Sequence, residues 1–262
     1  MAIYDSHAHP NLEPLTHKLS EIINDSESNN IYFNVVGVDI ESSKLAIKIA
    51  NKHFQWAKAC VAIHPNDVQK FDFNDSKKIL FHICEQNLNV IAAIGECGLD
   101  FYYSDKYKDL QYKFLLMHLE LANKFKLPLM LHVRNAYDEI IEFLKKYSPK
   151  VPIIIHCFSG NKKDAKKLLE LKQFLNIYFS IPGIVTFKNA ADLQDAVKEI
   201  PLELMIVETD SPWLAPMPYR GKENKPLYVK YTIEKIAELK KLDFVEVADK
   251  TFVNSINLFR KR

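Results

Sequence analysis

Residues 2–10 read AIYDSHAHP, a short apolar run followed by two histidines that are separated by one residue. The run Ala2–Tyr4 predicts a buried strand, with His7 and His9 at its C-terminal end. Side chains two residues apart in a strand point to the same side, so both imidazoles are expected to face the same way. Imidazole is a common ligand for divalent transition-type ions. The pair is also compatible with two polar residues that close a strand, so its meaning depends on partners elsewhere in the chain.

Apolar, β-branched runs recur along the rest of the chain, and nearly continuous apolar runs are typical of strands buried on both faces. The predicted strands are Ala2–Tyr4, Ile31–Val38, Trp56–Ile63, Val90–Ile94, Leu127–Val133, Val151–Ile155, Phe174–Ser180 and Leu204–Val207. The amphipathic segments between them predict helices. The most distinct of these segments are Tyr107–Phe125, Asn161–Leu171, Asn189–Glu199, Tyr228–Lys241 and Glu246–Phe259.

Eight strands alternating with helices predict an α/β protein with a (β/α)8 TIM-type barrel, formed as a single domain over residues 1–262. A doubly wound open sheet is the alternative. That alternative is weakened because no glycine-rich phosphate loop follows the first strand. The end of the chain, Arg260–Arg262, is expected to be frayed.

The composition indicates a soluble protein without a strong electrostatic preference. The 35 Lys and Arg residues nearly balance the 33 Asp and Glu residues, so the net charge of +2 does not announce a nucleic-acid binder, although a local basic patch would suffice. The four cysteines show no CxxC spacing, which predicts reduced thiols rather than a zinc ribbon or disulfides. No signal peptide and no apolar stretch of about 20 residues is found, so we expect a cytoplasmic protein without a membrane partner.

Polar, chemically active residues stand at the C-terminal ends of the predicted strands, where barrel enzymes carry their active sites. They are His7 and His9, His64, Glu96, His132 and Arg134, His156, and finally Glu208 and Asp210. Gathering so many buried polar groups is costly unless they bind a metal or one another. The joint pattern therefore predicts a metal site.

Two divalent ions fit this set better than one. The candidate ligands His7, His9, Glu96, His132, His156 and Asp210 exceed what one tetrahedral zinc needs. Glu96 is the candidate for a carboxylate that bridges both ions. Two ions about 3.5–4 Å apart can clamp a phosphoryl displacement, and the identity of the ions stays open between Mg²⁺, Mn²⁺ and Zn²⁺.

Three residues of this set are predicted to be catalytic. Asp210 would bind one ion and orient or deprotonate the attacking water, and Glu96 would hold both ions. His64 would donate to a substrate oxygen, although it can also be read as an ordinary loop histidine beside Pro65.

Seven segments together carry a resemblance that covers essentially the whole chain. They are DSHAHPNL, AIHPND, IGECGLDFYY, LHVRNAYDE, IHCFSG, GIVTFKNA and ETDSPWLAPMPYRGKENKP. In this order they resemble the TatD family of metal-dependent deoxyribonucleases. The resemblance implies a barrel of the metal-dependent hydrolase superfamily with a one- or two-metal phosphodiesterase site. It also implies DNA as the substrate, often hydrolysed from the 3′ end of single strands.

Carried over to this sequence, His7 and His9 resemble the ligands of the first ion and Glu96 the shared carboxylate. His132 and His156 resemble the ligands of the second ion, and Asp210 matches the catalytic acidic position. The chain departs from the family pattern at Asn135, where many relatives have Asp, at Pro182, which is often small and polar, and at Trp213, which is often Tyr. These departures put the substrate preference in doubt, not the metal site.

Substrate contacts are predicted at the barrel mouth. Arg220, together with Lys222, and Arg134 would meet backbone phosphates, and Tyr219 would stack on a base. Alternatively, Arg220 pairs with Glu223 or Asp210 and only fixes its loop. The aromatic segment Phe101–Tyr103 is expected either to wall the site or to pack against a helix.

We expect the protein to act as a monomer. Three other functions compete with that of a deoxyribonuclease. An amidohydrolase acting on C–N bonds shares the barrel and the HxH pair, but its two-metal members commonly use a modified lysine where this chain has Glu96. An ester hydrolase acting on aminoacyl-tRNA would use the same site. A binding protein with a decayed site is disfavoured because every proposed ligand is present.

Overall fold

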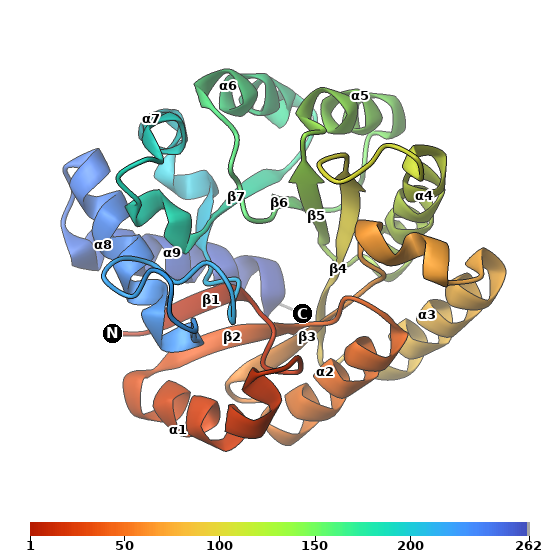
Figure 1. Ribbon diagram of the computed structural model, residues 1–262, viewed down its shortest axis with the longest axis horizontal. Coiled ribbons are helices and arrows are strands. Elements are labelled where there is room, and N and C mark those ends of the chain that lie inside the picture. Colours follow the sequence, from red (N-terminus) through yellow and green to blue (C-terminus); the bar gives the residue numbers. More distant parts are fainter. Residues whose placement is uncertain (261–262) are drawn as a thin grey trace.

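Eight parallel strands close into a barrel in chain order, and helices cover its outside (Figure 1). The computed structural model describes residues 1–260. The strands are β1 (Ile3–Ala8), β2 (Ile31–Val36), β3 (Ala57–Val61), β4 (Ile91–Asp100), β5 (Leu129–Arg134), β6 (Ile153–Ile155), β7 (Ile177–Ile181) and β8 (Met205–Val207). The prediction of a single-domain (β/α)8 barrel is confirmed, and the open-sheet alternative is wrong because β8 pairs with β1.

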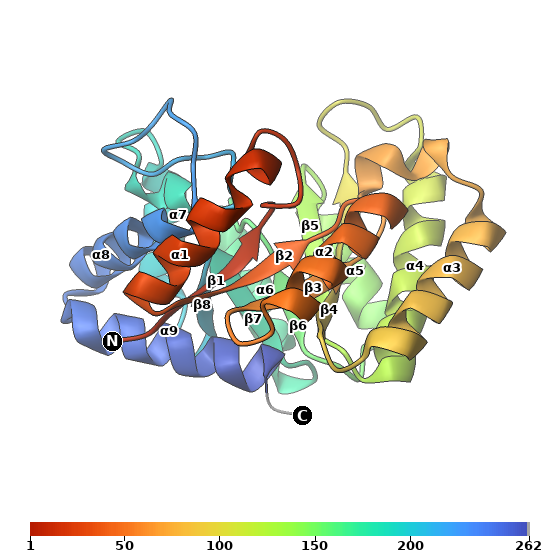
Figure 2. The same cartoon turned by 90° about the horizontal axis from the view of Figure 1, so that it is seen from below.

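Helices follow the strands and form the outer layer. They are α1 (Leu19–Asn29), α2 (Ile40–Lys52), α3 (Phe73–Asn87), α4 (Lys108–Phe125), α5 (Tyr137–Tyr147), α6 (Lys162–Glu170), α7 (Ala191–Glu199), α8 (Val229–Lys240) and α9 (Phe244–Phe259). Figure 2 shows α9 and the N-terminus at one end of the barrel, while long loops rise from the opposite end. The strands end at that loop side, so the predicted site residues share one mouth.

The interior of the barrel is closed at the α9 end. A small buried cluster contains one or two apolar residues from nearly every strand. Such residues meet only in the barrel interior, and Phe259 of α9 packs against them. Arg260 lies over the rings of Tyr4 and Tyr32, and its guanidinium donates to the backbone oxygen of Gln55 at 3.0 Å. The prediction of a frayed end is therefore wrong for Arg260. Lys261 and Arg262 lie outside the described residues.

Strand β4 is longer than its apolar pattern predicts, ending at Asp100 rather than at Ile94. The added residues include Gly98, which has a φ of +147° and packs so closely on β5 that a Cβ would lie 2.0 Å from the carbonyl oxygen of His132. Only glycine permits this approach. The resulting register pairs Gly98 with His132, which sets two acidic residues of β4 beside the histidine of β5.

Two composition-based expectations have structural counterparts. All four cysteines are free thiols, as predicted. Among the helices of residues 1–260, none is long and apolar enough to cross a membrane.

A buried histidine ties α4 to the end of β3. His118 lies in α4, its Nδ1 donates to the backbone oxygen of Phe114 at 2.7 Å, and its Nε2 accepts the backbone N–H of Ile63 at 3.1 Å. Burial lowers the pKa of His118 to about 4. Protonation would remove the acceptor that holds the residue preceding His64.

Stability is expected to fall as the pH drops from about 6.5 to about 4, because the unfolded chain then binds a proton at His118 that the folded chain refuses. The contribution amounts to about 3 kcal/mol of unfolding free energy. Urea unfolding of wild type and His118→Gln at pH 7, 6 and 5 measures it. The variant should show a shallower pH dependence, whereas His82→Gln, at an exposed position on α3, should match wild type. Equal slopes in all three proteins would refute the assignment.

Candidate metal centre

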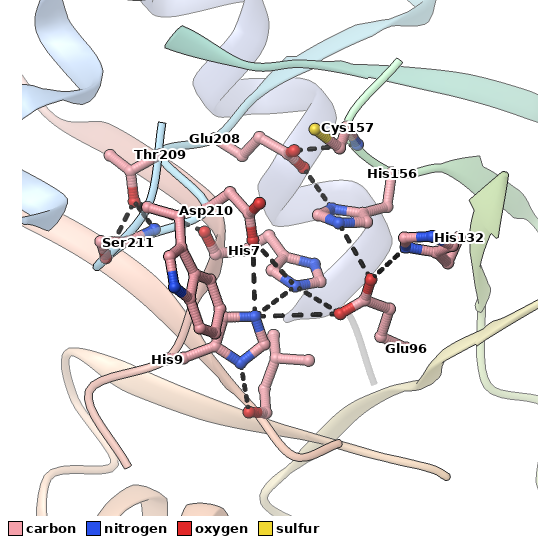
Figure 3. A network of polar contacts seen from close by, with 12 residues as sticks. His7, His9, Glu96, His132, His156, Cys157, Glu208, Thr209, Asp210 and Ser211 are labelled. Atoms are coloured by element: carbon pink, nitrogen blue, oxygen red, sulfur yellow. Dashed lines mark hydrogen bonds and ion pairs between the residues drawn. The ribbon is translucent and has the colours of Figure 1, made fainter. Parts of the chain in front are cut away.

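A cavity of about 670 Å³ opens at the mouth of the barrel. Its lining includes six of the predicted metal-binding and catalytic residues, His9, His64, Glu96, His132, His156 and Asp210. His7 lies fully buried beside them, and its ring stacks on that of His156 with centroids 3.5 Å apart. The structure thus brings every predicted ligand into one cluster (Figure 3).

Glu96 lies at the centre of this cluster, and its two oxygens face different neighbours. Oε2 is 3.3 Å from Nε2 of His7. Oε1 is 2.6 Å from Nδ1 of His132 and 3.3 Å from Nε2 of His156. One carboxylate therefore separates two groups of donor atoms, which is the arrangement that a bridging ligand requires.

The first group of donors comes from the ends of β1 and β8. Nε2 of His7 and Nε2 of His9 are 3.0 Å apart, and Oδ1 of Asp210 is 3.4 Å from Nε2 of His9. The backbone N–H of Asp210 donates to the carbonyl oxygen of His7 at 2.9 Å, which holds the two chain segments together. With Oε2 of Glu96 this group offers two nitrogens and two oxygens, a donor set suited to zinc or manganese.

Four of the histidines are oriented by a contact of the ring nitrogen that points away from the centre of the cluster, here called the outer nitrogen. The contacts are His7 Nδ1 with the Met130 sulfur (3.1 Å), His9 Nδ1 with the Val36 oxygen (2.9 Å), His132 Nε2 with Asp100 Oδ2 (3.1 Å) and His156 Nδ1 with Glu208 Oε2 (3.0 Å). Each outer nitrogen faces an acceptor and so carries the proton of the neutral ring. The inner nitrogens then turn their lone pairs toward carboxylate oxygens. That contact is favourable only with a cation or a proton between them, so the donor set fits divalent metal ions.

His64 differs from the other four. Its Nδ1 accepts the backbone N–H of Asn66 at 3.1 Å, so the proton of the neutral ring is on Nε2, 3.3 Å from Oε1 of Glu96. This ring presents a donor to the cavity instead of a lone pair. The predicted role of His64, donation to a substrate oxygen, requires an N–H in this position.

The charges of the cluster reinforce one another. Burial opposes ionisation of Glu96, but the neighbouring His156 and His64 hold its pKa well below the usual range. Burial also opposes protonation of His132, yet hydrogen bonds to Asp100 and Glu96 raise its pKa to about 9. By contrast, burial lowers the pKa of His7 to about 3. The mouth therefore carries a negative field that attracts a proton or a cation.

Backbone strain is concentrated at this mouth. Within residues 1–260, eight non-glycine residues have a positive φ, and four of them, Asn30, Lys126, Ser148 and Lys241, are ordinary C-caps of helices. The other four are Asn135, Cys157, Asp210 and Leu214, and the last three line the cavity. Such conformations cost about 1–3 kcal/mol each and typically mark functional sites.

Two buried carboxylates in the cluster were not assigned roles from the sequence. Asp100 Oδ2 accepts from His132, and Glu208, which the sequence placed at the end of β8 without a role, accepts from His156 and from the backbone N–H of Cys157. Both accept a hydrogen bond from a predicted ligand and so orient its ring. In the sequence, only the place of Asp100 at the end of GECGLD, two residues after a glycine, could have indicated a role in the site. Asp100 reaches His132 because β4 pairs with β5 in this register.

Replacing Asp100 by Asn is expected to weaken binding of one metal ion by about 10–100-fold, because the amide loses the charge that fixes the His132 ring. Binding at the His7 and His9 side should change little. Isothermal titration of metal-stripped protein with Mn²⁺ measures the affinities of the two metal positions separately. Asp105→Asn, in the exposed loop that follows β4, serves as the control. Two unchanged affinities in the Asp100 variant would show that Asp100 does not position His132.

Of the predicted substrate contacts, the cavity contains only Arg134. Its guanidinium lies 3.7 Å from the ring centre of Tyr102, and no carboxylate of residues 1–260 forms an ion pair with it. Tyr103 also lines the cavity, so the aromatic segment walls the site rather than only packing on a helix.

Tyr219 and Arg220 lie outside the cavity lining. Tyr219 stacks on Tyr228 with ring centres 4.2 Å apart, and Arg220 packs over Phe187 and reaches Asn189. The alternative pairing of Arg220 with Glu223 is wrong, because Glu223 accepts from Lys18. One face of Tyr219 is thus covered by Tyr228, which leaves less of the ring for a base.

A barrel whose mouth gathers histidines and carboxylates around one shared glutamate defines a metal-dependent hydrolase. The family model described as TatD related DNase matches residues 4–260, and the chain belongs to this family.

Relatives of the same class resemble the chain over its whole length. An uncharacterized metal-dependent hydrolase of Mycoplasma genitalium is 45% identical, over 99% of this chain and 99% of the relative. One of Bacillus subtilis is 35% identical, over 98% and 99%. The crystal structure of a TatD homolog from Escherichia coli superposes with a TM-score of 0.90 over 99% of this chain and 98% of that one. At 23% identity this last likeness shows the shared fold.

Proposed function

We propose that the protein is a metal-dependent deoxyribonuclease that hydrolyses phosphodiester bonds of single-stranded DNA from the 3′ end. The observation that supports it most is the placement of Glu96, whose Oε2 faces His7 and whose Oε1 faces His132 and His156. A carboxylate shared in this way suits two ions that act together on one phosphate. The substrate itself follows from the family, whose model is described as TatD related DNase.

The residues of the cluster would hold two divalent ions. His7, His9 and Asp210, with Oε2 of Glu96, would hold one ion. His132 and His156, which both lie beside Oε1 of Glu96, would hold the other. When bound, such ions neutralise the charge of the phosphate and lower the pKa of water. The four imidazoles favour Zn²⁺ or Mn²⁺ over Mg²⁺ as tightly bound ions.

The side chains of the chain supply the remaining steps. Asp210 is ionised, because its hydrogen bond to His9 and the charge of His156 outweigh burial and lower its pKa. Its carboxylate can therefore accept the proton of the attacking water. His64 presents the N–H of Nε2 and can donate to the departing or non-bridging oxygen. Arg134, without a carboxylate partner among the described residues, supplies positive charge for a neighbouring phosphate.

The test is hydrolysis of 3′- and 5′-labelled single-stranded DNA by metal-stripped protein, with Mg²⁺, Mn²⁺ or Zn²⁺ added back. The proposal requires cleavage that depends on the metal, with label released first from the 3′ end. Intact DNA with every metal, in a protein that still binds two ions, would contradict it. Ester and amide substrates, beginning with aminoacyl-tRNA, would then be the next candidates for the same site.

A further inference from the structure

A second cavity, of about 270 Å³, lies beside the metal cavity. Its walls come from the loop that follows β3 and from the loop and first turn of α4 that follow β4. Asn66 and Tyr103 line both cavities, so the two spaces adjoin across these side chains. A molecule bound at the metal centre can therefore extend into the second cavity.

The second cavity has no charged side chain in its lining among the described residues, in contrast to the metal cavity. Among the described residues that line it, the polar ones are amides and hydroxyls, including Gln69, Ser104 and Tyr107. Asn66 uses its amide nitrogen on Asp100 at 2.8 Å, and Gln69 uses its own on the backbone oxygen of Asn66 at 2.8 Å. The amide oxygens of both side chains remain as acceptors. Neutral donors and acceptors of this kind suit the hydrogen-bonding edge of a nucleobase and offer nothing to a phosphate.

Tyr103 supplies the flat apolar surface that a base also needs. Its side chain is 71% exposed, although it stands between two cavities. The ring of Tyr102 meets it edge-on at 4.9 Å, and the guanidinium of Arg134 lies 5.2 Å from its ring centre. These contacts hold the ring in place while leaving most of it open. Exposed aromatic rings that border a positively charged group are typical stacking platforms for single strands.

The position of the cavity relative to the metal centre defines what would occupy it. The backbone N–H of Asn66 donates to His64, and its side chain donates to Asp100, which in turn orients His132. The cavity thus borders the His64 and His132 side of the cluster. Its size lies just below the roughly 300–1,000 Å³ of pockets that hold drug-sized ligands, so it suits one base and not a base pair.

We propose that this cavity binds an unpaired nucleobase of a nucleotide that flanks the scissile phosphate, with Tyr103 as the stacking platform. The proposal rests on the proposed function and deepens it. The base has to be unpaired, since its hydrogen-bonding edge faces Asn66 and Gln69 and its partner strand has no space. The subsite therefore selects single strands over duplexes.

Short oligonucleotides with one abasic nucleotide test the subsite. The two nucleotides that flank the scissile phosphate are the last and the next-to-last at the 3′ end. In wild type, removing the base from one of these two nucleotides should raise KM about tenfold, which is the effect of losing one stacked base, and should change kcat little. Tyr103→Ala should raise KM of the normal oligonucleotide to a similar degree and should no longer distinguish it from the abasic one. Tyr103→Phe keeps the ring but loses the hydroxyl that accepts from Arg134 at 3.4 Å, and it should still distinguish the normal oligonucleotide from the abasic one.

Phe174→Ala is the matched control, because it removes an aromatic ring that is 77% exposed in the loop before β7, at the other end of the barrel. If wild type hydrolyses DNA but the abasic substitution costs Tyr103→Ala as much as it costs wild type, the subsite is wrong and the nuclease stands. If wild type leaves all of the oligonucleotides intact with every metal, the proposed function is wrong and the subsite falls with it.

Discussion

Replacing Glu96 by Gln is expected to lower metal-dependent hydrolysis on the order of 1,000-fold or more. The carboxylate offers Oε2 to the side of His7 and Oε1 to the side of His132. The amide of Gln is neutral and presents one oxygen only, so it can serve one side at most. Titration of the stripped variant with Mn²⁺ should show one ion or none where wild type binds two.

Glu203→Gln is the control for this experiment, since Glu203 is exposed near the N-terminal end of β8 and contacts Lys250 at 3.7 Å. It should retain wild-type activity and two ions. Circular dichroism of the Glu96 variant should match wild type, because the substitution preserves the shape of the side chain. Two tightly bound ions in Glu96→Gln would contradict the role of Glu96 as the shared ligand.

Asp210→Asn should also reduce the rate constant on the order of 1,000-fold, with a smaller effect on substrate affinity. The carboxylate lies 3.4 Å from Nε2 of His9, and the proposed function assigns it the proton of the attacking water. The φ of Asp210 is +56°, a conformation that Asn adopts readily, so the fold should tolerate the change.

Single-turnover hydrolysis, which reports the chemical step alone, measures this effect. Asp195→Asn, on the exposed face of α7, is the matched control. A variant that keeps more than about a tenth of the wild-type rate would remove Asp210 from the chemistry. In that case His64, whose Nε2 carries an N–H into the cavity, would be the next residue to test.

The pattern of the sequence was sufficient to predict the barrel, because its strands are short, apolar and separated by amphipathic helices. It failed for the second half of β4, where glycines and an acid replace the apolar run that indicates a strand. What stabilises that segment is the close approach of Gly98 to His132 on a neighbouring strand. A contact between residues 34 positions apart leaves no local signal.

The metal ligands could be predicted from local sequence pattern. The residues that orient these ligands could not. The alternation of His7 and His9 along one strand indicates that both are ligands. The other donors are indicated by their position at the ends of strands. Asp100 acquires its role only through the register of β4 against β5, and Tyr219 loses part of its surface to Tyr228 from a later segment of the chain. Both depend on tertiary contacts. Sequence position placed Tyr219 at the mouth, whereas in the structure it stacks on Tyr228 outside the cavity lining.

The central claim is that Glu96 joins two metal positions in one catalytic site. Anomalous diffraction from a crystal grown with Mn²⁺ tests it most directly. We expect two peaks about 3.5–4 Å apart, one among His7, His9 and Asp210 and one beside His132 and His156, with an oxygen of Glu96 on each. A single peak, or two peaks of which only one contacts Glu96, would contradict it.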